Sequence, residues 1–173
     1  RGMVSLWQQG ERREVLLFGS EIYFDATHDP GYDYPPEVQR LSDEGVRLLR
    51  KEDFAGAAAV LAQAHALAPE VVGVMNNLAA AWEQQGQSQR AHELLDRIFA
   101  LRPDYFFARV AKARLLIRDG EVERADAMLR ELLTLERLHV SEHVALCSAQ
   151  IDVALVRGNK ETANTWLSLW RQV

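Results

Sequence analysis

Apolar residues recur along this chain with a period of 34 positions. An alanine is followed four positions later by a leucine in each period: Ala57 and Leu61, Ala91 and Leu95, Ala125 and Leu129. Pro69 and Pro103 share the 34-residue interval, as do Gly86 and Gly120. The next glycine of this series, Gly158, comes after 38 positions, so the spacing predicts one extra helical turn inserted near residues 137–143.

Each period predicts two helices. The first helices are expected at about 38–50, 72–85, 106–119 and 140–157, and the second at about 54–67, 88–101, 122–136 and 161–172. Glycine at the end of a first helix favours a left-handed cap, and proline ends the second helices. Ser88 and Asn159 are candidate N-caps. Connections of two to four residues make each pair of helices antiparallel.

Small residues recur where the two helices of a pair should cross. Gly45, Ala79 and Ala113 fall in the middle of the first helices, opposite the repeated alanines of the second helices. Helices approach closely only where side chains are small, and the following leucines fill the space beside the crossing. We therefore predict that Ala91 and Ala125 are almost fully buried.

The unit resembles the tetratricopeptide repeat, whose pattern is W-x2-L-G-x2-Y, then A-x3-F, then proline. The first unit offers Gly45, Ala57-x3-Leu61 and Pro69, whereas the third has Arg137 where proline is expected. The resemblance covers 38–173, divided at about 38–71, 72–105, 106–139 and 140–173. It implies an all-α, right-handed superhelix of about four antiparallel helix pairs, whose first helices line a concave groove. Members of this family usually bind peptides or protein segments there and usually are not enzymes.

Residues 1–37 form an extension of a different kind. We expect a short helix at Met3–Gln9 and a β-hairpin that joins 14–18 to 21–24 across Gly19 and Ser20, with strand confined to 12–26. A proline-rich linker, which includes Tyr34, should lead to the first helix. Because an isolated hairpin is marginal in water, it must pack on the array, on another chain or on sequence upstream. We favour packing on the array.

Groove-facing positions are the candidate binding residues. The helical period places the following residues there: Asn76, Asn77, Phe107, Arg114, Arg118 and Arg50, with Ser148, Asp152 and Val156 in the last unit. The two arginines of the third unit could hold an acidic or carboxylate-bearing segment through charge-assisted hydrogen bonds. One branch of the family clamps a C-terminal carboxylate with lysine and asparagine, and only Asn77 matches that clamp. The other clamp positions hold Ser42, Val46, Phe107 and Ala111.

Two clusters contain metal-ligand residue types, but neither predicts a metal site. The acidic loop consists of Asp25, His28, Asp29 and Asp33, whose spacing matches no calcium or zinc signature. His139, His143 and Cys147 are spaced by four, so on one helix the outer two stand about 12 Å apart along the axis. That distance is too long for one zinc ion. We expect a solvated turn in the first case, a buried thiol in the second, and no cofactor.

Charge and composition exclude several functions. The formal net charge is −5, without the basic block that nucleic-acid binding requires. No run of about 18 apolar residues could span a membrane, and the motifs of nucleotide-binding, hydrolase and zinc-protease sites are absent from the sequence. We expect a cytoplasmic protein that is not an enzyme. The chain begins at Arg1, so any targeting signal would lie upstream.

The C-terminal helix carries Trp166, Leu169 and Trp170. Stacked repeats need a polar end. Leu167 and Trp170 should meet the preceding helix, which leaves Trp166 and Leu169 partly toward the open end. We expect a second copy of the chain, as a homodimer, or missing sequence to cover them; alternatively, the tryptophans fold into their own repeat.

The favoured function is a binding module: an adaptor, co-chaperone or assembly factor. The alternative is a regulatory or oligomerisation domain of a longer protein with an enzyme upstream.

Overall fold

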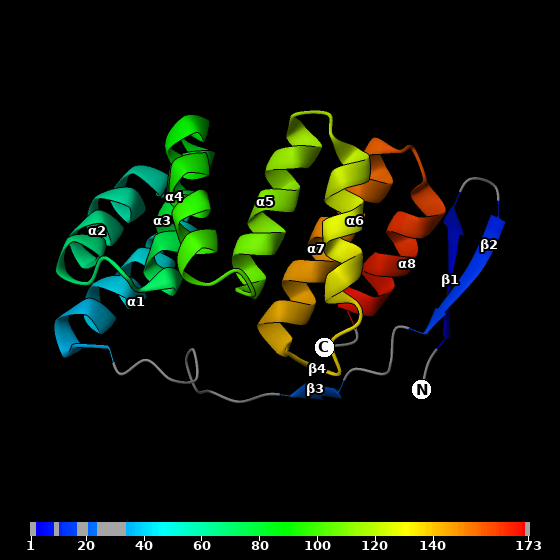
Figure 1. Ribbon diagram of the computed structural model, residues 1–173, viewed down its shortest axis with the longest axis horizontal. Helices are drawn as coiled ribbons and strands as arrows, with labels where there is room; N and C mark the ends of the chain where they lie inside the picture. Colours follow the sequence, from blue (N-terminus) through cyan, green and yellow to red (C-terminus); the bar gives the residue numbers. More distant parts are fainter. Residues whose placement is uncertain (1–2, 9–10, 17–20, 24–33, 172–173) are drawn as a thin grey trace. The chain divides into compact units, whose positions relative to one another are not determined.

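The computed structural model describes residues 3–8, 11–16, 21–23 and 34–171, and the chain divides into two compact units. The α1–α4 unit spans 27–111, and the α6–α8 unit joins 1–26 to 112–173. Helix α5 (Phe106–Arg118) belongs to the first unit up to Ala111 and to the second from Lys112. The described part of the chain is predominantly helical, as the repeat pattern predicts (Figure 1).

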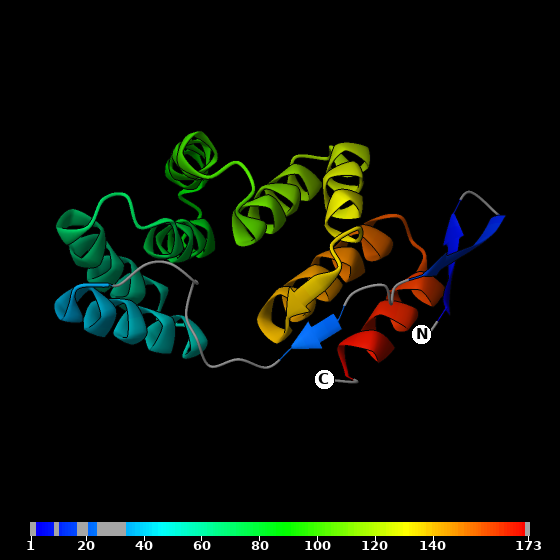
Figure 2. The same cartoon turned by 60° about the horizontal axis from the view of Figure 1, so that its bottom comes forward.

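The α1–α4 unit consists of two antiparallel helix pairs. Its helices are α1 (Pro36–Arg50), α2 (Phe54–Leu67), α3 (Val72–Gln84) and α4 (Ser88–Leu101). Helix α1 packs on α2, α3 packs on α4, and α2 contacts α3 between the pairs (Figures 1 and 2). These bounds agree with the predicted ones to within two residues. The N-cap expected at Ser88 is one residue off, because Gln87 holds that position and Ser88 is already helical.

Left-handed residues end the first helices, as the glycine series predicts. Gly86, Gly120 and Gly158 have φ of 73°, 83° and 70°. The chain then turns sharply: the amide of Gln87 donates to the carbonyl of Trp82 over 2.9 Å. The same turn ends α1, but there Glu52 takes the left-handed conformation with φ of 61°. Glu52 stands 34 positions before Gly86, so the series extends to the first repeat without its glycine.

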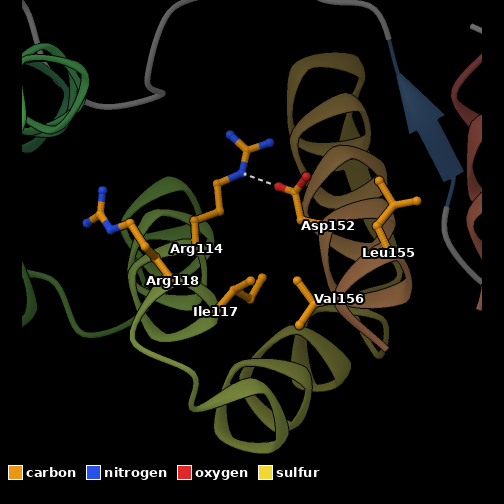
Figure 3. A pocket seen from close by; sticks show the side chains of 6 residues that line it. All are labelled: Arg114, Ile117, Arg118, Asp152, Leu155 and Val156. Atoms are coloured by element: carbon orange, nitrogen blue, oxygen red, sulfur yellow. Dashed lines mark ion pairs between the residues drawn. The ribbon is translucent and has the colours of Figure 1, made fainter. Parts of the chain in front are cut away.

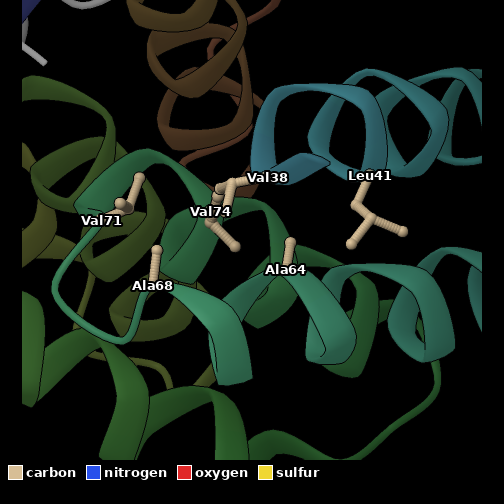
Figure 4. Close-up of a cluster of buried hydrophobic side chains, with 6 residues drawn as sticks. All are labelled: Val38, Leu41, Ala64, Ala68, Val71 and Val74. Atoms are coloured by element: carbon tan, nitrogen blue, oxygen red, sulfur yellow. The ribbon is translucent and has the colours of Figure 1, made fainter. Parts of the chain in front are cut away.

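The helix crossings are built on small residues. The repeated alanines of the second helices are buried: Ala57, Ala91, Ala125 and Ala163. A Cβ at Gly45 would lie 2.4 Å from Cγ of Leu61, closer than any stable contact. Glycine is therefore required in α1 for α2 to approach as it does. The buried cluster beside this crossing draws on α1, α2, α3 and the turn between α2 and α3 (Figure 4).

The α6–α8 unit contains the insertion that the spacing predicts. Its helices are α6 (Val122–Leu132), α7 (Val140–Val156) and α8 (Lys160–Trp170). Helix α7 has 17 residues where α3 and α5 each have 13, so the extra turn lies within α7. Asn159 caps α8 as predicted, and its side chain accepts the amide of Thr162 over 3.0 Å. Helix α7 packs on both α6 and α8.

The strands correct the expectations for residues 1–37. Strands β1 (Met3–Gln8) and β2 (Glu11–Leu16) pair antiparallel, so the helix expected at Met3–Gln9 is wrong. Strand β3 (Glu21–Tyr23) pairs in parallel with β4 (Arg137–His139), and the expected pairing across Gly19 and Ser20 is replaced by these two ladders. The β-prone residues of β1 favour a strand once a partner is available. Strands β1 and β4 lie outside 12–26, the range to which strand was expected to be confined. Helix α6 ends at Leu132, four residues earlier than predicted.

The described strands lie beside the last helices of the array. Strand β1 contacts α8, and β3 contacts α7 as well as its partner β4 (Figure 1).

Pro36, expected in the linker, is instead the first residue of α1, a position that suits proline because its missing N–H has no helical partner there. Tyr34 precedes it and packs on the buried cluster of the α1–α4 unit.

Candidate functional site

Two of the predicted groove arginines line a hollow in the α6–α8 unit. Arg114 and Arg118 extend from α5, and α7 lies opposite them (Figure 3). The hollow has a volume of about 360 Å³ and is open to solvent. We call it the α5–α7 hollow; its lining residues are Arg114, Ile117, Arg118, Asp152, Leu155 and Val156.

The floor of the α5–α7 hollow is apolar and exposed. Ile117 and Val156 face each other between the two helices (Figure 3). Leu155 and Val156 are 56% and 57% exposed, an unusual state for two adjacent large apolar residues. The packed faces of α7 are already occupied, because its buried residues contact α6 and α8. The end of α7 therefore presents apolar surface that the described residues of its own unit do not cover.

The rim of the hollow carries three charges. Arg114 Nε lies 3.2 Å from Asp152 Oδ2, and Arg114 Nη2 donates to Ser148 Oγ over 2.5 Å. The guanidinium of Arg118 extends away from Asp152 (Figure 3). Two arginines and one aspartate give this rim a formal charge of +1. The cations are a property of α5 itself, which contains four lysines and arginines and no acidic residue.

Sequence reasoning found the charged rim but missed most of the floor. The helical period selects Arg114, Arg118, Asp152 and Val156 as groove positions, and the structure brings these four together. Ile117 and Leu155 were missed because each is one position away from a groove residue, so the helical period did not select them. A signal was present in the sequence: Leu155 and Val156 are adjacent, and two adjacent helical residues cannot both point into one narrow seam.

The α1–α4 unit places a second set of predicted residues on α3. Asn76 and Asn77 are half-buried there, and Oδ1 of Asn76 is buried without a hydrogen-bond partner among the described residues. One turn earlier, a Cβ at Gly73 would lie 3.1 Å from Tyr34 Oη and 3.6 Å from Tyr105 Oη. Two phenol hydroxyls thus converge on α3 beside the asparagines. We call this surface the α3 face.

The remaining predicted groove residues do not extend either site as expected. Phe107 lies at the start of α5, where it packs edge-to-face on Tyr105 with ring centroids 5.9 Å apart. It therefore belongs to the aromatic surroundings of the α3 face. Arg50 is the last residue of α1 and is exposed.

The histidine and cysteine cluster is structural. His139 lies before α7 as its N-cap and accepts the amide of Ser141, so it is separated from the other two residues. His143 Nε2 lies 3.5 Å from Cys147 Sγ and 3.4 Å from the carbonyl oxygen of Leu169. Burial raises the pKa of the Cys147 thiol to about 12, which makes it a poor nucleophile and metal ligand.

Metal and membrane sites find no support in the described residues. Across 3–8, 11–16, 21–23 and 34–171, no three acidic, histidine or cysteine side chains are placed to share a metal ion. The acidic loop of Asp25, His28, Asp29 and Asp33 lies outside this part of the chain. None of the described helices has the length and apolar character needed to cross a bilayer.

The predicted C-terminal interface residues divide differently from our expectation. Trp166 is 1% exposed and packs in a buried cluster with Cys147 and Leu169. The prediction that Trp166 and Leu169 face the open end is therefore wrong. Trp170, assigned to the preceding helix, is instead 42% exposed. Trp166 and Leu169 do lie on one face of α8, as the helical period predicts. That face packs around Cys147 of α7 and does not point to the end of the array.

Comparison with known proteins identifies the repeat. The family profile described as tetratricopeptide repeat matches residues 48–106 and 84–149. The solved structure titled MamA RS-1 ArsTM double mutant has a TM-score of 0.52 at 17% identity, over 79% of this chain and 77% of that one. PilF of Pseudomonas aeruginosa has a TM-score of 0.51 at 22% identity, over 78% of this chain and 60% of PilF. No curated protein matches the sequence. The structural likenesses support the fold.

Proposed function

The chain belongs to the tetratricopeptide repeat family, and from this premise we propose that it is a non-catalytic module that binds a segment of another protein. In the proposed arrangement the helix pairs form a right-handed superhelix, and the first helix of each pair contributes to the binding surface. The adaptor, co-chaperone and assembly-factor roles all require this activity. The observation that carries the proposal is the α5–α7 hollow, where exposed apolar residues lie within a charged rim.

The chemistry of the hollow favours binding over catalysis. Its titratable groups are two arginines and one aspartate that already pairs with Arg114. Arginine does not give up its proton near neutral pH, so it offers charge and hydrogen bonds and no acid–base function. Exposed apolar residues inside a polar rim are typical of protein-binding surfaces.

The α3 face supports the same function with different chemistry. Asparagine amides and tyrosine hydroxyls both donate and accept hydrogen bonds, which suits the peptide groups of an extended segment. The buried Oδ1 of Asn76 gains the most from a ligand donor, because an unsatisfied buried acceptor costs about 1–3 kcal/mol. We infer that Asn76 and Asn77 contact the main chain of the bound segment.

Site-specific photo-crosslinking tests the proposal. A benzophenone amino acid replaces Val156 in the hollow, and a second variant carries it in place of Leu67 as the matched control. Leu67 is 59% exposed at the end of α2, so the two positions present similar apolar surface. We expect a discrete crosslinked polypeptide from position 156 in extracts of the source cells and none from position 67. Equal crosslinking at both positions, or none at position 156, would contradict a binding role for the hollow.

A regulatory or oligomerisation role within a longer protein is the second candidate. It is favoured by strands β1 and β3, which join residues near the start of the chain to the last helices of the array. In this proposal the segment that binds the hollow belongs to the same protein or to another copy of it. The crosslinked polypeptide of the experiment above distinguishes the two roles by its sequence.

A further inference from the structure

We infer that the N-terminal strands form a terminal cap on the last helix pair, and that the segment containing β4 holds this cap in place. The N-terminal strands are β1, β2 and β3, and the last helix pair consists of α7 and α8. The cap lies within the α6–α8 unit, because that unit includes residues 1–26. This role goes beyond the proposed function and does not depend on it, since it requires no bound partner.

Two apolar positions of the second helices are less covered in the last pair than in the others. In the first three pairs these positions are at most 2% exposed: Leu61 and Ala64, Leu95 and Ile98, Leu129 and Leu132. One repeat later, in α8, the same positions hold Leu167 and Trp170. Leu167 is only partly buried, and Trp170 is 42% exposed. Helix α8 therefore presents apolar surface at positions that the repeat buries elsewhere.

A second helix is usually covered by the first helix of the following pair. Helix α3 contacts α2 in this way, and α7 contacts α6. Helix α8 is the last of the described helices, and besides α7 the described element that it contacts is β1. In both views β1 lies beside α8, on the side away from α7 (Figures 1 and 2). Strand β1 therefore supplies the neighbour that the other second helices receive from a following pair.

The connection between α6 and α7 differs from the other connections between pairs. It spans 133–139, whereas the connections before α3 and α5 span 68–71 and 102–105. The added length contains β4, and Leu138 in the middle of that strand is 4% exposed. Strand β4 is thus fixed to the core of the α6–α8 unit and offers a main-chain edge to a second strand.

Strand β3 uses this edge and keeps the hairpin close to α8. Ile22 stands opposite Leu138 in the parallel ladder, and β3 also contacts α7. Because β3 begins at Glu21, shortly after β2 ends at Leu16, the ladder holds the β1–β2 hairpin at a high effective concentration beside the last pair. Such a tether matters because a two-stranded hairpin is marginal by itself. Each helix of the last pair is thus contacted by one N-terminal strand.

The first test disrupts the ladder in the full chain with Ile22→Pro. Proline lacks the amide hydrogen and fits poorly in the middle of a ladder. Native-state hydrogen exchange, detected by mass spectrometry, then reports the opening of each helix. We expect the amides of α8 to exchange about tenfold faster than in the parent chain and those of α2 to be unchanged. Ile22→Val keeps a β-prone residue and is the matched control, which should exchange like the parent.

The second test strengthens the same contact with a disulfide between β3 and β4. Glu21→Cys combined with Arg137→Cys places thiols on facing residues of the ladder. Neighbouring strands lie about 5 Å apart, within the Cα separation of about 4.4–6.8 Å that a disulfide spans. Cys147 is buried and should not compete. We expect α8 to exchange about tenfold more slowly in the oxidised form than in the reduced form of this variant, because β1 then stays beside α8.

The results that would overturn the cap are distinct from those that bear on partner binding. Failure of the disulfide to form would show that β3 does not lie on β4. Equal exchange of α8 in the parent chain and in Ile22→Pro would show that α8 needs no cover from these strands. If Ile22→Pro does not fold, the oxidised and reduced forms decide, and equal α8 exchange in the two forms would overturn the cap. None of these results changes the proposed role of the α5–α7 hollow.

Discussion

Glu52 is the residue that departs most clearly from the repeat. It takes φ of 61° at the position where later repeats have glycine. A left-handed conformation costs a residue with a Cβ about 1–2 kcal/mol, and glycine avoids that cost. We predict that Glu52→Gly raises the free energy of unfolding by about 1 kcal/mol in chemical denaturation. The matched change Gly86→Ala should lower it by a similar amount. A destabilised Glu52→Gly variant or a stabilised Gly86→Ala variant would contradict this account.

The contact between Gly45 and Leu61 offers a second test at the scale of single residues. Alanine in a helix interior gains about 1 kcal/mol over glycine, whereas overpacking a buried contact costs about 1–3 kcal/mol. Because Leu61 is fully buried and cannot move aside cheaply, the clash should dominate. We predict that Gly45→Ala lowers the free energy of unfolding by about 1 kcal/mol.

A double-mutant cycle supplies the control for this prediction. In a Leu61→Ala background the clashing atoms are absent, so adding Gly45→Ala should no longer destabilise the chain and should recover the helix-propensity gain. Equal losses in the two backgrounds would show that the cost does not come from the crossing of α1 and α2.

At the scale of elements, α6 is connected to the end of α7 by a buried charge. Arg157 donates to Asp126 over 2.9 Å and to Glu123 over 2.7 Å, and Asp126 is buried. Removing Arg157 leaves that carboxylate with Arg130 as its remaining cation. We predict that Arg157→Ala lowers the free energy of unfolding by about 1–3 kcal/mol, since hydrogen bonds to buried charged groups are among the stronger ones.

Arg124 provides the matched control for Arg157. Its pairing with Glu121 lies within one exposed helix turn, and such pairs contribute about 0–1 kcal/mol. Arg124→Ala should therefore change stability little. If the two variants lost the same free energy of unfolding, the buried position of Asp126 would have no energetic role.

Helices could be predicted from the sequence far better than strands. The alanine, leucine and glycine that recur every 34 residues predict the helix bounds well, because each of them affects the helix only within one or two turns of its own position. The pairing of β3 with β4 joins Glu21 to Arg137, and no local pattern encodes a partner so distant. The strand β1 was predicted as a helix for a different reason: a short apolar run fits either structure, although its partner β2 follows almost directly.

The candidate site was predicted in part, for a related physical reason. The helical period identifies which residues share a face, so it found Arg114, Arg118 and Val156. It does not fix how far the face extends, which depends on the neighbours that cover each residue. Ile117 and Leu155 were missed on that account, and the phase of α8 was misjudged, with Trp166 buried and Trp170 exposed.

At the scale of the whole molecule, the burial of Trp166 and Leu169 weakens the argument for a homodimer. Among the three predicted interface residues, Trp170 alone stays substantially exposed. We predict that the chain sediments as a monomer at micromolar concentration in analytical ultracentrifugation. A dimer that becomes monomeric in Trp170→Glu would contradict this prediction and restore the interface. Trp166→Glu is unsuitable for that test, because it buries a charge and should unfold the α6–α8 unit.

The central claim is that a partner segment binds in the α5–α7 hollow, and a pair of dissociation constants tests it most directly. The segment crosslinked at position 156 is synthesised, and its affinity is measured for the parent chain, Val156→Asp and Leu67→Asp by titration calorimetry. Both substitutions place a carboxylate on similarly exposed apolar surface. The account predicts at least tenfold weaker binding to Val156→Asp and unchanged binding to Leu67→Asp. Equal affinity for the two variants would contradict it.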